Sequence, residues 1–299
     1  MSSSIKSKYG RHLLSENILR YFPFKRKAFL EIYEITYMDN TSLDEKIIFT
    51  IYKYYDDFKK FMLSEQLPDI EIKILLENNV CAKLNHNDLI KEKYILNINI
   101  DLFKYNKKFI RSILFLEFTH IHDFYLIHSS FTNEETLNLM TSYSEYNASR
   151  IELISQFGIN NIKSMTKRFS KNFNVVYKNE TIKIDEYVIY PLTSAMGIIE
   201  SEMKSFNNLS DFEYAEQFVT SEKFMMYYYG KLDAANKYLD TPLPDIYLKN
   251  KTVFYHEFEQ LHNILNMDVD LKMRYHFIKE YLDKYQFCFY NYFIHSTKE

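Results

Sequence analysis

In the N-terminal half, segments in which apolar residues have helical spacing are separated by segments with strand-like spacing. Apolar residues recur at helical intervals over residues 43–64, which predicts an amphipathic helix. Two runs in which apolar and polar residues alternate follow at 70–76 and 94–101, and each predicts a half-buried strand. Helical spacing returns over 107–126. The N-terminal half is therefore expected to hold a small sheet together with two long helices.

The pattern of the C-terminal half is mainly helical. Helical spacing covers residues 133–157, and Gly158 is well placed to end that helix because glycine readily adopts the left-handed conformation found there. A short hairpin is expected at 175–184. Further helical runs are expected at 187–206, 221–239, 251–266 and 269–293. The predicted fold class is α+β, with an N-terminal module over residues 1–160 and a mainly α-helical region over residues 161–299.

Length and composition describe a folded chain that does not depend on metals or disulfides for its core. The chain has 299 residues, of which 46% are hydrophobic. Cys81 and Cys288 are far apart and form no metal-type spacing, so a reduced, cytoplasmic setting is expected. No apolar stretch approaches the roughly 18 residues of a membrane span, so no membrane association is expected. The four glycines are isolated, which disfavours phosphate-binding loops.

Charge and aromatic residues suggest two kinds of partner. The net charge of −3 argues against a general nucleic-acid binder. The segment 6–27 is strongly basic and is a candidate site for an anionic partner, although a solvated basic face is the commoner explanation. The aromatic runs at 224–229 and 287–293 are expected in the core; a protein partner or a homo-oligomer contact is the alternative.

Candidate chemistry lies in the helix predicted at 107–126. Glu117 and His120 are three residues apart and therefore share one face of this helix. Zincin metallopeptidases present His-Glu-x-x-His on a helix, where the two imidazoles bind zinc and the glutamate activates the bound water. In this chain Leu116 stands at the position of the first histidine. A glutamate from the next helix is the third ligand in one class of zincins, and Glu145 is suitably placed.

These motifs resemble a zincin-like metallopeptidase family of Gram-positive bacteria and their phages and mobile elements, related in architecture to the peptidases that cleave phage-type repressors. That family carries His-Glu-Phe-Thr-His-x-x-Asp-Phe and, downstream, Ser-Glu-Tyr/Phe-x-Ala. The matching residues here are Glu117, Phe118, Thr119, His120, Asp123, Phe124, Ser144, Glu145, Tyr146 and Ala148. The resemblance covers roughly residues 40–160 and implies a zincin-like N-terminal module.

The resemblance also implies site residues and a biological setting. It implies His120 and Glu145 as metal ligands, Asp123 as a further candidate ligand, and Glu117 at the general-base position. It implies zinc as the metal, if any is bound, and a role in phage defence or mobile-element regulation. Leu116 departs from the pattern, because leucine cannot donate to a metal. The loss of one ligand should weaken zinc binding by several kcal/mol, given roughly 10–16 kcal/mol shared by four ligands in structural zinc sites.

The leading hypothesis is therefore a degenerate zincin-like protein, a pseudoenzyme that has no cofactor and acts by binding a protein partner. Glu117, His120, Asp123 and Glu145 would then form a hydrogen-bonded cluster between two helices. One alternative is an active zinc metallopeptidase with a variant ligand set. Another is a helical interaction or toxin-like protein without metal.

A second metal pattern is weaker. Glu259-x-x-His262 repeats the spacing of Glu117 and His120, and paired motifs of this kind occur in di-iron helix bundles. Such bundles also need an inward glutamate from each of two further helices, which we cannot assign, and a strand is expected just before the Glu117 helix. A di-iron site is therefore disfavoured.

Overall fold

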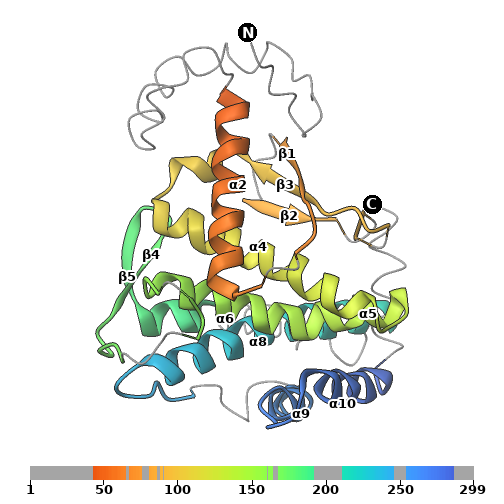
Figure 1. Cartoon of the computed structure of the whole chain (residues 1–299). Coiled ribbons are helices and arrows are strands. Elements are labelled where there is room, and N and C mark those ends of the chain that lie inside the picture. Colours follow the sequence, from red (N-terminus) through yellow and green to blue (C-terminus); the bar gives the residue numbers. More distant parts are fainter. Residues whose placement is uncertain are drawn as a thin grey trace.

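The computed structural model describes residues 43–64, 67–75, 81–85, 88–89, 91–159, 161–163, 168–191, 211–245 and 254–285. The fold is mixed α and β with helix dominating, as expected at the level of fold class. A small sheet and α2 lie above a stack of long helices, with α9 and α10 at the bottom (Figure 1). The basic segment 6–27 and the aromatic run 287–293 fall outside the described residues.

Helix α2 (Leu43–Met62) packs its apolar face on α4 (Lys107–His128). The ring centroids of Tyr55 and Phe118 are 4.8 Å apart, and those of Phe58 and Phe115 are 5.3 Å apart. Aromatic pairs at such distances stabilise a contact beyond the area that they bury. Both helices were predicted from their spacing and are confirmed, and their contact holds α4 against the N-terminal part of the chain.

The three-stranded sheet has the order β1-β3-β2, formed by β1 (Glu71–Leu75), β2 (Ala82–Leu84) and β3 (Ile95–Asn99). Strand β3 pairs in parallel with β1 and antiparallel with β2. The sequence predicted β1 and β3 but not β2, because three residues are too few to show alternation. A 3₁₀ turn (Ile100–Lys104) follows β3, and Asn106 caps α4 by accepting a hydrogen bond from the backbone of Lys108 at 2.9 Å.

The helix predicted at 133–157 is interrupted by a wider turn. It consists of α5 (Asn133–Leu139), a π-helical turn (Met140–Ser144) and α6 (Glu145–Gln156). Thr132 and Glu135 form a capping box at its start. Gly158 follows its end with φ of 69°, as its predicted role as a stop requires. The π turn has no signature in the apolar spacing, so the sequence did not reveal it.

The C-terminal half contains a hairpin and three described long helices. Strands β4 (Asn174–Tyr177) and β5 (Glu180–Lys183) pair antiparallel, as predicted, and residues 184–191 are helical. They are followed by α8 (Asp211–Tyr238), α9 (Tyr255–Leu265) and α10 (Leu271–Asp283). Helix α8 begins well before the expected residue 221.

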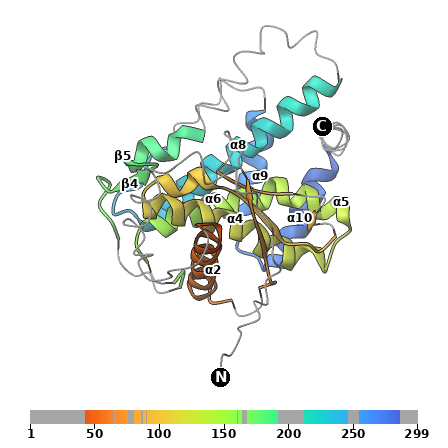
Figure 2. The ribbon, with the colours of Figure 1, turned by 90° about the horizontal axis from the view of Figure 1, so that it is seen from above.

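Helix α8 runs alongside α6 in a close contact (Figures 1 and 2). A Cβ added to Gly230 would overlap the side-chain oxygen of Ser149 and the carbonyl oxygen of Tyr146, so only glycine permits this approach. In the run 224–229, the side chains of Met225, Met226, Tyr228 and Tyr229 are buried, which confirms a core position for them. None of the described helices has the length and apolar character that a membrane span requires.

Candidate functional site

Charged side chains from α4, α6 and α8 come together in one cluster. The Nε2 atom of His120 on α4 lies 3.4 Å from Oε2 of Glu145, the first residue of α6. The other oxygen, Oε1, lies 2.8 Å from Nζ of Lys223 on α8. Glu117 on α4 is buried and interacts electrostatically with all three. Glu117, His120 and Glu145 thus converge as predicted, whereas Lys223 was missed because no local motif connects it to them.

A chain of hydrogen bonds orients the ring of His120. The hydroxyl of Ser144 donates to Oδ2 of Asp123 at 3.0 Å, and Nδ2 of Asn147 donates to both oxygens of Asp123 at 3.0 and 3.1 Å. The same hydroxyl lies 2.8 Å from Nδ1 of His120. A serine hydroxyl has one proton, which Asp123 receives, so Ser144 accepts a hydrogen bond from Nδ1. Asp123 is therefore part of the site through Ser144, and Nδ1 of His120 carries a proton.

The proton on Nδ1 determines whether Nε2 of His120 presents a lone pair or a proton to Glu145. In a neutral ring with the proton on Nδ1, the lone pair of Nε2 would point at a carboxylate oxygen, which is repulsive. A second proton removes the conflict and makes His120 an imidazolium paired with Glu145. Burial lowers the pKa of His120, but Glu145 and Glu117 raise it and the net shift is upward. The hydrogen-bond geometry and the electrostatics thus both favour a His120 ring that is protonated on both nitrogens and positively charged.

The two carboxyl groups respond to the site in opposite directions. Burial opposes ionisation of Glu145, but Lys223 and His120 outweigh it and hold the pKa of Glu145 well below its usual range. Burial raises the pKa of Glu117; the charge of Glu145 adds to this, while His120 and Lys223 oppose it. The pKa of Tyr227 on α8 is raised as well, first by burial and then by the charges of Glu145 and Glu117. Glu145 is thus the fixed negative charge of the cluster.

The donor set fits a catalytic zinc only in part. Two ligands about 2.0–2.1 Å from a tetrahedral zinc are roughly 3.3–3.4 Å apart, which matches the 3.4 Å between His120 and Glu145. Catalytic zinc, however, uses three protein ligands. At the position of the first histidine in the zincin pattern the chain has Leu116, which is 7% exposed and lies outside the main apolar cluster. Among the described residues, no group of three or more His, Cys, Asp or Glu side chains is arranged to hold a metal.

The π turn (Met140–Ser144) shapes the site from the side of α6. It ends directly before Glu145 and carries Ser144, so both groups that contact His120 are placed by this turn. π turns are rare and occur frequently at functional sites, because they rotate side chains out of the regular helical register. The sequence predicted the residue types of this segment but not the wider turn that orients them.

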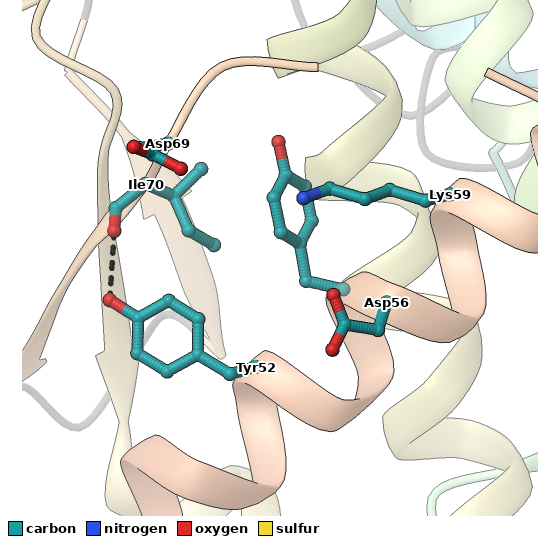
Figure 3. Close-up of a pocket in the computed structure, with 6 residues that line it drawn as sticks. Tyr52, Asp56, Lys59, Asp69 and Ile70 are labelled. Carbon is teal, nitrogen blue, oxygen red and sulfur yellow. Dashed lines mark hydrogen bonds between the residues drawn. The ribbon is translucent and has the colours of Figure 1, made fainter. Parts of the chain in front are cut away.

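A small pocket lies elsewhere, between α2 and the start of β1 (Figure 3). The hydroxyl of Tyr52 donates to the carbonyl oxygen of Ile70 at 2.8 Å, and that of Tyr55 donates to the carbonyl oxygen of Pro68 at 2.7 Å. Nζ of Lys59 lies 4.6 Å from the centre of the Tyr55 ring. These contacts anchor the chain entering β1 to α2, which is a structural role.

The second Glu-x-x-His motif takes part in a different contact. Nε2 of His262 on α9 lies 2.9 Å from Oδ2 of Asp233 on α8, and its ring stacks on Tyr229 with centroids 3.8 Å apart. His262 therefore joins α9 to α8. Its imidazole is engaged with an aspartate and a tyrosine of one helix.

Comparisons of the chain with protein-family models, with curated proteins and with solved structures found no match. The features that bear on function are therefore those of the site itself. They are a histidine, a buried glutamate and a lysine that share one charge network.

Proposed function

We propose that this protein is a degenerate zincin-like protein, a pseudo-metallopeptidase that uses no metal and acts by binding a protein partner. The observation that carries the proposal is the contact of 2.8 Å between Lys223 and Glu145. In a zincin the charge of the ligand glutamate is balanced by zinc. Here Lys223 and the imidazolium of His120 provide that positive charge, and Leu116 removes a metal ligand.

A charge network of this kind suits a binding role. The side chain of Lys223 is 45% exposed, whereas those of Glu145 and His120 are nearly buried. The network is therefore buried at Glu145 and His120 and reaches the surface at Lys223, where a charged partner can contact it. The biological setting that we propose, phage defence or mobile-element regulation, comes from the resemblance of the motifs.

The zinc content of the purified full-length chain tests the metal-free part of the proposal. The chain is incubated with one equivalent of zinc, desalted, and analysed for metal, together with His120→Ala and Glu145→Gln. We expect far less than one zinc per chain in all three proteins. A stoichiometric zinc in the natural chain that both substitutions abolish would overturn the proposal.

The binding part requires a comparison of surface variants. Lys223→Glu reverses the half-exposed charge of the network, and Lys272→Glu reverses an exposed charge on α10 as a matched control. We expect capture of the cellular partner to be lost with Lys223→Glu and retained with Lys272→Glu. Equal capture by both variants contradicts a role for the network in binding.

A second candidate function, a metallopeptidase with a variant ligand set, is favoured by one observation. Nε2 of His120 and Oε2 of Glu145 are spaced as two zinc ligands would be, and the contact of this oxygen with His120 at 3.4 Å is too long and poorly aligned to satisfy it as a hydrogen bond among the described residues. The zinc measurement distinguishes the two candidates, because only the peptidase requires bound metal.

A further inference from the structure

Another buried carboxyl group lies at the contact between α8 and the π turn. Glu222 is fully buried, and its Oε1 is in hydrogen-bond contact with the hydroxyl of Ser142. Its Oε2 has no hydrogen-bond partner among the described residues. An ionised carboxylate in such a place is costly unless a cation or several donors compensate it.

No described charged group compensates Glu222. Several titratable side chains of the surrounding elements have other partners: Lys223 of α8 pairs with Glu145 of α6, and His120 of α4 contacts Glu145 and, through Ser144, Asp123. The rings of Tyr143 of the π turn and Tyr275 of α10 pack against each other. Among the described residues, only burial and the Ser142 hydrogen bond act on Glu222. Burial raises the pKa of Glu222 to about 8, against the smaller opposing effect of Ser142.

The hydrogen-bond geometry points to the protonated form independently. The hydroxyl of Ser142 also lies 3.4 Å from the carbonyl oxygen of Asn138, so one hydroxyl proton faces two acceptors if Glu222 is ionised. If Glu222 is protonated, it donates to Ser142, and Ser142 donates to Asn138. Each proton then has one acceptor.

We propose that Glu222 is a neutral carboxylic acid whose hydrogen bond with Ser142 stabilises the contact between α8 and the π turn. Ionisation of Glu222 weakens this contact, so the docking of α8 is a pH-sensitive switch. The contact is close in sequence to the candidate site. Ser142 lies three residues before Glu145, and Glu222 directly precedes Lys223. Loosening at Glu222 therefore separates the two ends of the Glu145–Lys223 ion pair. This inference goes beyond the proposed function and holds whether or not the site binds metal.

The first experiment observes the carboxyl group directly in the natural full-length chain. The ¹³C signal of the Glu222 carboxyl, assigned by its absence from Glu222→Gln, is followed from pH 4 to pH 10. We expect a midpoint near the pKa of about 8 rather than near the ordinary value of 4.5. A midpoint near 4.5 would overturn the proposal. The titration itself is followed in the natural chain, and the variant serves only to assign the signal.

The second experiment tests the switch. Amide hydrogen exchange over residues 140–147, corrected for intrinsic rates, is compared at pH 6 and pH 9. We expect protection to fall by about tenfold or more in the natural chain but to stay constant in Glu222→Gln, which keeps the hydrogen bond to Ser142 and cannot ionise. The matched control is Glu152→Gln, which removes a buried carboxyl that is paired with Lys231 and should keep the pH dependence. Equal loss of protection in the natural chain and in Glu222→Gln overturns the proposal.

Discussion

Replacing Leu116 by histidine should convert the two-donor site into a three-ligand zinc site. Residue 116 lies one helical turn before His120 on α4, so a new imidazole would share the face of the existing one. Because Leu116 lies outside the main apolar cluster, the exchange does not open the core. The other two donors, on His120 and Glu145, are already 3.4 Å apart.

The expected gain in zinc affinity follows from the binding free energy that each ligand contributes. About 10–16 kcal/mol spread over four ligands gives roughly 3–4 kcal/mol for the new histidine, or about 10²–10³-fold in the dissociation constant. Lys223 competes with zinc for Glu145, but its side chain is 45% exposed, so its ion pair contributes under about 1 kcal/mol after screening by solvent. Adding Lys223→Met should therefore tighten zinc binding by a further factor of at most about five.

The assay is a competition titration against a chromophoric zinc chelator at pH 7.5. Leu116→Phe is the matched control, since it introduces a ring of similar size without a donor atom. If Leu116→His binds zinc no more tightly than Leu116→Phe, the assignment of residue 116 to the first ligand position is wrong. If the natural chain already binds as tightly as Leu116→His, the metal-free function is wrong instead.

Three further predictions test the contacts around the site. Gly230→Ala should destabilise the protein by about 1–3 kcal/mol in urea unfolding, because its Cβ would overlap atoms of α6; an unchanged midpoint contradicts the close approach. Lys231→Met should cost about 3–5 kcal/mol, because it leaves Glu152, 3.1 Å away, as an unpaired buried charge, and the added change Glu152→Leu should recover most of that loss. Measured by NMR, the pKa of His120 in the natural chain should lie above the ordinary value of 6.5, and it should be lower in Glu145→Gln than in the natural chain. Since the folded pKa is raised, the stability from this pair is complete below pH 6.5 and is lost as the pH rises through the raised pKa; identical titrations in both proteins contradict the pairing.

The sequence predicted the elements that carry a clear period and missed those that do not. The helical spacing at 43–64 and 107–126 corresponds to α2 and α4, and the alternation at 70–76 corresponds to β1. Strand β2 was missed because it is short. The π turn was missed because a local widening of a helix leaves the apolar spacing of its surroundings almost unchanged.

For the candidate site, the spacing of Glu117 and His120 predicted a shared helical face, and Glu145 was expected near them. These three do share one charge cluster. The role of Ser144 was not predicted, because a serine in a helical segment has many ordinary uses. Lys223 was not predicted either, because it lies far along the chain in a helix whose docking no local pattern specifies.

By itself, the sequence determined the chemistry that depends on residue type: a leucine at position 116 cannot bind metal in any fold, and Glu117 and His120 must share a face in any helix. The tertiary structure decided the charge state. The packing of α8 on α6 brings Lys223 to Glu145, and the contact between α4 and the π turn sets the proton on His120. Charge and tautomer depend on neighbours in space, so packing determines them and local spacing does not.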